Sequence, residues 1–452
     1  MKNLNRCQKL IWLMLVVFLL GMIVLFIKIQ LEASYYIVNS NSKCLGYVYD
    51  RNGDIIFDND ADYTSGKYEW GHFKDVGNLI GDASGQTTNT LVARNSEKLN
   101  NYSFTQGINH SNGQASIYTT LNHQANQIVY SAFGSKDGSA IAYNYKTGEV
   151  LVCVSKPCVD TVIGYQDLEK GSLLCKNFIK TVPGSTQKVS TLISALERFG
   201  TNQLDTIKYT CNGVYTNLTG DDIKCHNLYG HGEEDISQAF ANSCNVYFAQ
   251  LVENPSFGLD SIIKTYRKLG YSVNGEEDKY ININGIKSET ASTTLTNADD
   301  FNTQWGCIGQ GETMVSPCQL MMWQSAIANG TGKCTYPYLI DHAVNVNGKR
   351  YDDAITEYTS QLFTTATAER TREIELQNGT NNYSGSIYGY NVGVKSGTAQ
   401  VENGEKENSL LVGFNYDEEN PIAFCILIED KQDGDYVSTD SIASTILDSL
   451  CE

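Results

Sequence analysis

The hydrophobic pattern opens with an uninterrupted apolar run, LIWLMLVVFLLGMIVLFI, at residues 10–27. As a helix, this run would rise about 27 Å, nearly the thickness of the hydrocarbon core of a bilayer. Lys2, Arg6 and Lys9 precede it, so the positive-inside rule places the short N-terminus in the cytoplasm and the remaining chain outside. We therefore expect an uncleaved, single-pass membrane anchor. A cleaved signal peptide is the alternative, but signal cores are usually shorter and no clear A-x-A site follows the run.

Short alternating apolar segments follow the anchor. Between residue 35 and about residue 135, segments such as GYVYD and DIIFD are separated by stretches rich in Asn, Ser, Gly and Tyr. This pattern favours short strands joined by turns. Acid, base and nucleophile types do not gather there, so we predict a spacer or a protein-docking pedestal rather than a catalytic unit.

The pattern changes near Gly138. SAIAYNYKTGEVLVCVS predicts two strands around a turn, and LLVGFNYDEENPIAFCILIE predicts a second pair near the C-terminus. Between them, TQKVSTLISALERFG and SPCQLMMWQSAIANG have helical periodicity. Strands that bracket a helical middle indicate an α/β sandwich with a mainly antiparallel sheet and helices on both faces. The predicted division is a cytoplasmic tail at 1–9, an anchor at 10–28, a β-rich pedestal at 29–135 and a larger domain at 136–452.

Composition narrows the possible partners and cofactors. A formal net charge of -18 repels phosphate backbones, so we expect no nucleic-acid partner. The thirteen cysteines are an odd number; Cys211 and Cys225 flank a short polar segment and either close a local disulfide loop or remain free thiols. No C-x-x-C pair occurs, and Cys153, Cys158 and Cys175 lack a convincing histidine partner, so we expect no metal site and no cofactor.

The first candidate for chemistry is PGSTQK, which contains Ser185 and Lys188 and precedes an amphipathic helical pattern. A three-residue step places both side chains on one face, where a desolvated lysine can take the serine proton. The amides at the start of that helix can stabilise an oxyanion. S-x-x-K alone is a weak signal, because it also occurs at Ser40–Lys43 and Ser261–Lys264; neither follows Pro-Gly.

The second candidate is SCN, in which Ser243 and Asn245 lie between two helical runs, DISQAFAN and VYFAQLV. A short loop at this point would project both polar side chains into a cleft. The same pattern recurs at residues 272–274 after Gly270, where a turn is a sufficient explanation.

The third candidate is KSGT, which ends the alternating stretch GYNVGV and is therefore predicted to lie on a strand. Lys395 supplies positive charge, and Gly397 would allow a substrate backbone to approach closely. Ser396 and Thr398 can donate hydrogen bonds to a carboxylate, and the Thr398 amide is a candidate second oxyanion donor. The similar KTG at residues 146–148 is predicted to be only a hairpin turn.

Order and context make these weak patterns specific when they are taken together. PGSTQK, FANSCNVYF and GVKSGTAQV follow one another along the chain, and they resemble the three signature motifs of the penicillin-recognising serine transpeptidases. The resemblance covers residues 138 to about 430. Upstream, the anchor and YVYDRNGDIIFD look like the start of a class B penicillin-binding protein, although the pedestal is short.

The resemblance implies a peptidoglycan D,D-transpeptidase that cross-links D-Ala-D-Ala stem peptides through an acyl-enzyme at Ser185 and is acylated by β-lactams. It implies Lys188 as the acylation base, Ser243 as a proton relay, Asn245 as a holder of the substrate amide and Lys395 as the organiser of charge. A membrane glycosyltransferase of the SEDS type is the implied partner.

Three other activities stay open within the same resemblance: a D,D-carboxypeptidase, a β-lactamase, and a β-lactam sensor or non-catalytic scaffold for a cell-wall polymerase. A β-lactamase would need a further base for deacylation and is usually a shorter chain. All reactive residue types are present, which argues against a scaffold alone. Ser409 and Leu410 stand where many relatives carry aromatics, which leaves the choice of acceptor open.

Overall fold

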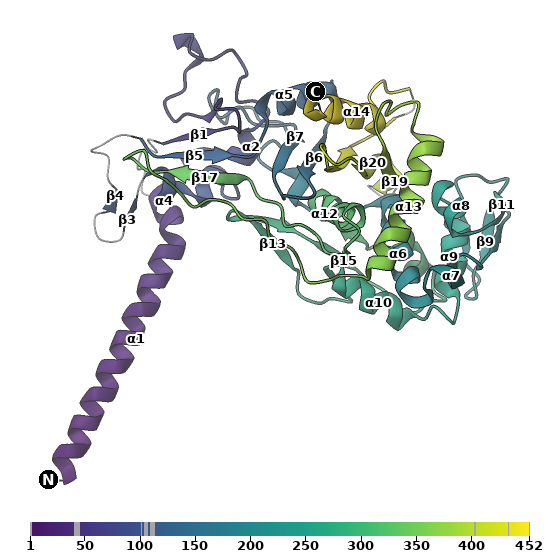
Figure 1. Cartoon of the computed structure of the whole chain (residues 1–452), viewed down its shortest axis with the longest axis horizontal. Coiled ribbons are helices and arrows are strands. Elements are labelled where there is room, and N and C mark those ends of the chain that lie inside the picture. Colours follow the sequence, from purple (N-terminus) through teal and green to yellow (C-terminus); the bar gives the residue numbers. More distant parts are fainter. Residues whose placement is uncertain are drawn as a thin grey trace.

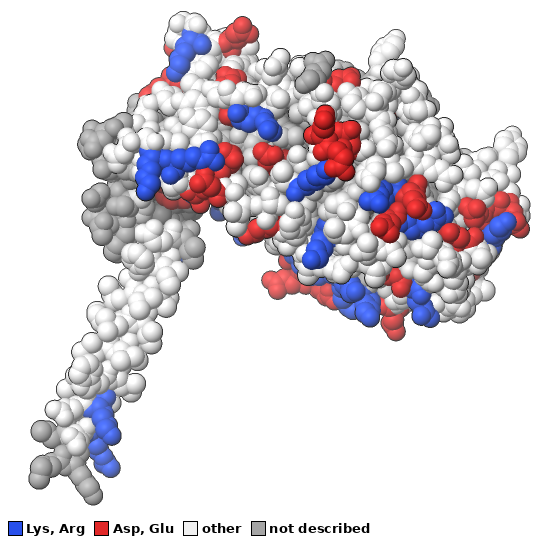
Figure 2. Space-filling view, viewed as in Figure 1, with Lys and Arg blue, Asp and Glu red and all other residues white. Residues whose placement is uncertain are grey.

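The computed structural model describes residues 2–39, 46–100, 102–103, 107–108, 114–401, 404–432 and 434–451. Its first element, α1 (Lys2–Asn39), leaves the body as one long helix (Figure 1). Within it, Asn5–Gln30 contains an 18-residue stretch with a mean hydropathy of 3.2 and is long and apolar enough to cross a membrane. On the face shown in Figure 2, the middle of this helix carries no charged side chain, and basic side chains lie near its N-terminal end. The helix is longer than the predicted run, because the polar residues on both sides also continue it.

A small sheet lies where α1 meets the body (Figure 1). Its strands, in spatial order, are β18 (Arg350–Tyr351), β17 (Ile340–Val344), β5 (Ser116–Thr119), β1 (Tyr47–Tyr49) and β2 (Ile55–Phe57). The β1 and β5 strands are parallel, and the other pairs are antiparallel. Two of the five strands therefore come from beyond residue 136, a non-local pairing that strand patterns in the sequence do not reveal.

Short elements complete the predicted pedestal region. They are η1 (Tyr63–Ser65), α2 (Gly77–Ile80), α3 (Leu91–Arg94), α4 (Ser96–Leu99), β3 (Tyr102–Ser103), β4 (Gly107–Ile108) and α5 (His123–Ala132). The predicted short strands are present, but helical turns separate them. The α5 helix precedes residue 135 yet packs on the larger sheet through Val129, with Phe133 following directly after it.

The larger sheet is five-stranded and antiparallel throughout. Its strands, in spatial order, are β19 (Val392–Val401), β20 (Lys406–Asn415), β21 (Ile422–Ile428), β6 (Gly138–Asn144) and β7 (Val150–Lys156). Both predicted strand pairs are confirmed. The β6–β7 turn closes because the Asn144 side chain accepts hydrogen bonds from the Lys146 and Thr147 amides, so the KTG there is only a turn.

Helices cover both faces of the larger sheet, and the predicted α/β sandwich is confirmed (Figure 1). The α5 helix and α14 (Thr439–Cys451) lie on one face. On the other face lies α12 (Pro317–Ala328), which is buried along its whole length, with α6 (Lys188–Phe199) and α13 (Thr365–Asn382) nearby.

The helical middle of the chain joins β7 to β19. Its other elements are η2 (Lys176–Phe178), η3 (Gly184–Gln187), α7 (Thr201–Leu204), β8 (Tyr209–Cys211), β9 (Val214–Thr216), β10 (Asp222–Lys224), β11 (Gly232–Glu234), α8 (Ile236–Ala241), α9 (Asn245–Glu253), α10 (Leu259–Lys268), β12 (Tyr271–Val273), β13 (Tyr280–Ile283), β14 (Ile286–Glu289), β15 (Ala291–Thr293), α11 (Phe301–Ile308) and β16 (Met314–Val315). Two of the three motifs lie here, and the third lies on β19.

Candidate active site

Ser185 lies on η3, a 3₁₀ turn that leads directly into α6. Its hydroxyl Oγ is 2.7 Å from the Nζ of Lys188. Lys188 is fully buried, because the first turns of α6 are enclosed on every side by the core. This burial lowers the pKa of the Lys188 amine from 10.5 to about 7, since a charged amine loses its hydration there. The pair is therefore a nucleophile beside a base that is partly neutral near pH 7.

The second motif surrounds the same amine. Lys188 Nζ lies 2.8 Å from the Ser243 carbonyl oxygen, 3.2 Å from Ser243 Oγ and 2.7 Å from Asn245 Oδ1. Ser243 adopts a φ of 51° between α8 and α9, a conformation that costs free energy outside glycine. Asn245 begins α9, and its Nδ2 donates to the Lys224 carbonyl at 3.0 Å. The predicted loop between two helices is confirmed.

The third motif completes the arrangement from β19. Lys395 Nζ is 3.1 Å from Ser243 Oγ and 2.8 Å from the Ser396 carbonyl. Burial lowers the pKa of Lys395 well below its ordinary value, and the nearby Lys188 lowers it further, while Glu375 opposes the shift. Ser243 Oγ therefore lies between two lysine amines, a position from which a hydroxyl can pass a proton.

Gly397 brings β19 against η3. A Cβ at this position would lie 2.8 Å from the Pro183 carbonyl and 3.1 Å from the Ser185 amide. Gly184, with a φ of 54°, faces the Thr398 carbonyl in the same way, at 2.6 Å from a Cβ. Gly397 therefore lets β19 approach η3 closely, which sets the distance between Ser185 and the third motif. That Gly397 also admits a substrate backbone stays a prediction.

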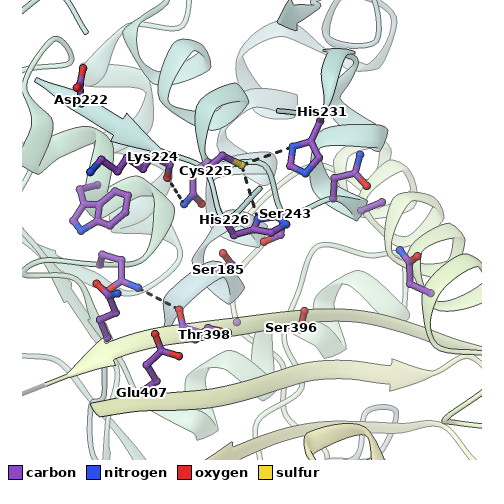
Figure 3. A pocket seen from close by; sticks show the side chains of 18 of the residues that line it. Ser185, Asp222, Lys224, Cys225, His226, His231, Ser243, Ser396, Thr398 and Glu407 are labelled. Carbon is purple, nitrogen blue, oxygen red and sulfur yellow. Dashed lines mark hydrogen bonds between the residues drawn. The ribbon is translucent and has the colours of Figure 1, made fainter. Parts of the chain in front are cut away.

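An open cleft of about 950 Å³ contains the exposed side of this arrangement (Figure 3). Six predicted residues line it: Ser185, Ser243, Asn245, Ser396, Gly397 and Thr398. The two lysines are buried beside it. The structure thus brings all eight predicted site residues together.

Several residues of the cleft carry no sequence signal of their own. Phe301 and Trp305 stack at 5.5 Å between ring centroids and line one wall. Gln310 Nε2 donates to the Thr398 carbonyl at 3.2 Å, and Tyr383 lies in the cleft beside Ser396. Gln310 lies in GQGETMVSP, a stretch that resembles the family, but the sequence does not indicate which of its residues faces the cleft.

The other S-x-x-K and S-x-N patterns stay away from the cleft. Ser261 and Lys264 lie on α10, with Lys264 exposed, and Ser272 lies on β12. The pattern at residues 40–43 falls outside the described residues. Position in the fold, and not the pattern itself, therefore distinguishes Ser185.

Residues 138–448 match a family model described as "Penicillin binding protein transpeptidase domain". The chain belongs to this family. Among curated relatives, the chain is 29% identical to stage V sporulation protein D of Bacillus subtilis, over 61% of this chain and 42% of that protein. It is 22% identical to peptidoglycan D,D-transpeptidase MrdA of Acinetobacter baumannii, over 70% and 51% respectively. The chain spans about half the length of the curated relatives it matches.

Solved structures share the fold of this chain. Penicillin-binding protein A of Mycobacterium tuberculosis superposes with a TM-score of 0.73 at 18% identity, covering 90% of this chain and 99% of that one. The D,D-transpeptidase domain of a peptidoglycan glycosyltransferase from Eggerthella lenta gives 0.71 at 22% identity, covering 89% and 97%. The predicted family and fold class are confirmed, namely a class B penicillin-binding protein with a transpeptidase-like α/β fold.

Proposed function

We propose that this protein is a membrane-anchored D,D-transpeptidase that cross-links D-Ala-D-Ala stem peptides through an acyl-enzyme at Ser185. The observation that carries the proposal is the 2.7 Å contact between Ser185 Oγ and the fully buried amine of Lys188. A serine with this partner is a competent nucleophile near neutral pH, because about half of the amine is neutral there.

In the proposed acylation, Ser185 Oγ attacks the carbonyl carbon between the two D-alanines, and neutral Lys188 accepts the hydroxyl proton. The C–N bond breaks, and the proton reaches the departing D-Ala amine through Ser243 Oγ, which lies within hydrogen-bond reach of Lys188. In the second half, the amine of another stem peptide attacks the ester. Its proton returns by the same route, and Ser185 leaves with its hydroxyl restored.

The remaining roles follow from where the side chains lie in the cleft. The Ser185 and Thr398 amides are the proposed oxyanion donors. Ser396 and Thr398 line the cleft on β19 and are the proposed partners of the terminal carboxylate, with the charge of Lys395 behind them. Asn245 is the proposed holder of the substrate amide.

The part of the chain that contains the cleft is proposed to lie outside the membrane, and the residues before the apolar stretch of α1 are proposed to lie in the cytoplasm. One apolar helix and basic residues at its N-terminal end support this orientation. A membrane glycosyltransferase of the SEDS type is the proposed partner, and co-purification of the full chain with and without α1 tests it. The division at residues 28 and 135 stays a prediction.

The test uses the full chain in detergent with a fluorescent penicillin. Wild type should acquire a stable label, and Ser185→Ala should acquire none. An unlabelled wild type contradicts the proposal, and a label that is lost in minutes indicates a β-lactamase. Incubation with a D-Ala-D-Ala peptide and an amine acceptor then separates a transpeptidase from a carboxypeptidase, since the second forms only the shortened peptide. A wild type that labels but releases no D-Ala indicates a sensor or scaffold.

A further inference from the structure

Tyr383 lies in the cleft beside the third motif, and no step of the proposed reaction uses it. The residue follows α13 directly, and its partly buried ring packs against the apolar core that includes Val392 and Val394 of β19. The Ser396 side chain lies within hydrogen-bonding reach of the Tyr383 hydroxyl. Thr398 lines the same cleft two residues farther along the strand, on the same side of β19 as Ser396 (Figure 3). Tyr383 thus adds a third hydroxyl group to this pair.

We propose that Tyr383 is a positioning residue that directs the Ser396 hydroxyl to the terminal carboxylate of the acyl donor. The Tyr383 hydroxyl donates to Ser396 Oγ, and the Ser396 hydroxyl donates to the carboxylate. The chemical class that these hydrogen bonds select is a D-Ala-D-Ala peptide or a β-lactam with a free carboxylate, rather than an ester or an amide. The inference rests on the proposed function, in which Ser396 and Thr398 are the carboxylate partners.

The number of protons at this part of the cleft gives Tyr383 its role. An ionised carboxylate only accepts hydrogen bonds, whereas a hydroxyl group donates one. The Ser396 proton can therefore go either to the Tyr383 oxygen or to the carboxylate, but not to both. A charge-assisted hydrogen bond is shorter and stronger than a neutral one. A bound carboxylate consequently takes the Ser396 proton, and the Tyr383 hydroxyl becomes the donor to Ser396 Oγ.

The surroundings of Tyr383 keep its hydroxyl group protonated. Burial raises the pKa of the Tyr383 phenol above its ordinary value of 10.0, and the Asp440 carboxylate raises it as well, while the Ser396 side chain opposes the shift. At neutral pH the phenol therefore carries its proton and can donate it. A hydrogen bond from Tyr383 also polarises the Ser396 hydroxyl, which makes Ser396 a stronger donor to the carboxylate.

Backbone hydrogen bonds hold Tyr383 in place at the end of α13. The Tyr383 amide donates to the Gly379 carbonyl at 2.9 Å, and the Tyr383 carbonyl accepts from the Ser386 and Ile387 amides at 3.0 and 2.8 Å. Gly379 also lets α13 approach β19, because a Cβ there would lie 1.7 Å from the Val392 carbonyl. The position of Tyr383 over β19 is therefore set before a ligand binds, which lowers the entropic cost of using it.

Side-chain contacts reinforce the attachment of this last turn of α13 to β19. Asn378 Nδ2 donates to the Val394 carbonyl at 2.8 Å. Asn382 Nδ2, one turn farther along the helix, donates to Asn378 Oδ1 at 2.8 Å. The strand segment just before Ser396 and the helical turn just before Tyr383 are thus joined directly, so the two hydroxyl groups are presented from one connected unit.

The substitution Tyr383→Phe separates the proposed role from support of the core. The phenylalanine ring keeps the apolar contacts that Tyr383 makes with the core and removes only the hydroxyl group. Its expected effect is therefore confined to ligands that carry the carboxylate. Tyr388→Phe is the matched control, because Tyr388 lies in the same connection between α13 and β19 and is 84% exposed.

The test uses the full chain in detergent and two forms of one penicillin, the free acid and its methyl ester, with acylation followed by intact mass. For Tyr383→Phe, the second-order rate constant of acylation by the free acid should fall about tenfold, as expected for one weakened hydrogen bond to a charged group. Acylation by the methyl ester should stay at the wild-type rate. With a D-Ala-D-Ala peptide, KM should rise while kcat stays nearly constant. Tyr388→Phe should behave like wild type with both penicillins.

A double-mutant cycle tests whether Tyr383 acts through Ser396. The double variant Tyr383→Phe with Ser396→Ala should lose no more acylation by the free acid than Ser396→Ala alone, because the second hydroxyl group has then lost the residue that it directs. Losses that simply add would overturn the route through Ser396.

Two other results would overturn the proposal. One is an unchanged rate with the free acid in Tyr383→Phe, and the other is an equal loss with the free acid and the methyl ester, which would show a general structural effect. A wild type that neither penicillin acylates would instead refute the proposed function, so the two failures are distinguishable.

Discussion

The pH dependence of acylation is the sharpest consequence of the buried Lys188 amine. Burial lowers the pKa of this amine from 10.5 to about 7. At pH 7, an ordinary lysine amine is neutral in about one molecule in 2,500, whereas an amine with the lowered pKa is neutral in about half. The structure therefore increases the population of the base by about a thousandfold. Acylation by a fluorescent penicillin should rise with pH, reach its half-maximum near pH 7 and stay level above pH 8.

Replacement of the amine provides the matched perturbation. Lys188→Met should slow acylation by about 10²–10⁴-fold, the usual contribution of a general base. Lys264→Met is the control, because Lys264 belongs to the other S-x-x-K pattern and is exposed on α10; it should acylate like wild type. The measurement is the second-order rate constant of acylation between pH 5 and pH 10, with Ser185→Ala as the blank.

The same shift predicts how unfolding depends on pH. Because the folded-state pKa of Lys188 is lowered, the unfolded chain binds more protons between pH 7 and pH 10.5, so stability rises with pH in that window. The free-energy cost of burying the charged Lys188 amine is fully present below pH 7 and amounts to about 5 kcal/mol. The Tm of Lys188→Met should not show this rise between pH 7 and pH 10.5. An acylation midpoint near pH 10, or identical slopes in both proteins, would refute the assignment of Lys188 as the neutral base.

Three further predictions concern other parts of the fold. Burial raises the pKa of Glu375 to about 8, and its ionised form raises the pKa of Lys395. Glu375→Gln should therefore change acylation little at pH 6 and slow it about threefold to tenfold at pH 9, measured with fluorescent penicillin. Gly397→Ala places a methyl group 2.8 Å from the Pro183 carbonyl; acylation should fall at least about a hundredfold and Tm should drop by the equivalent of about 1–3 kcal/mol. Burial would lower the pKa of His123, but its carboxylate partners raise it to about 9. Protonated His123 therefore stabilises the folded state by at most about 3 kcal/mol. This stabilisation is fully present below pH 6.5 and is lost as the pH rises through 9. His123→Gln should therefore lower Tm at pH 6 and change it little at pH 10.

Each of the three predictions has a control variant or a control condition. Glu369→Gln, on an exposed position of the same helix as Glu375, should leave acylation unchanged; an equal loss in both would point to α13 as a whole. Gly385→Ala adds a methyl group with nothing within 4 Å and should leave Tm unchanged. For His123, a Tm difference from wild type that is the same at pH 6 and pH 10 would contradict the ion-pair explanation.

Much of the candidate site could be predicted because the first and third motifs adjoin strongly periodic elements. The apolar positions of α6 start directly after PGSTQK, and the alternating residues of β19 lead into KSGT. Periodicity of this kind is local, so a sequence reveals it. The distance between the motifs is set by tertiary packing, yet their order along the chain already indicated that they meet.

The features that the sequence did not reveal depend on contacts between distant segments. The β17 strand joins the pedestal sheet from residue 340 onward and pairs with β5, although the region around it continues the larger domain. Glu375 lies in a helix with polar residues on every face, so its complete burial leaves no periodic signal. The pairing of β8 with β11 and the cap of α9 bring together Cys211, Cys225, His231 and Cys244, which lie too far apart along the chain to form a recognisable motif.

The second motif combines polar contacts to the Lys188 amine with structural support in one short segment. Ser243 and Asn245 direct their polar atoms to the Lys188 amine, whereas Cys244 between them is buried and its sulfur caps α9 by accepting a hydrogen bond from the Tyr247 amide. A strained φ of 51° at Ser243 persists only where the surroundings hold it, because a free loop would relax. The cap of α9 supplies part of that restraint. The positions of the two polar groups beside the Lys188 amine therefore depend on how firmly Cys244 is held in the core.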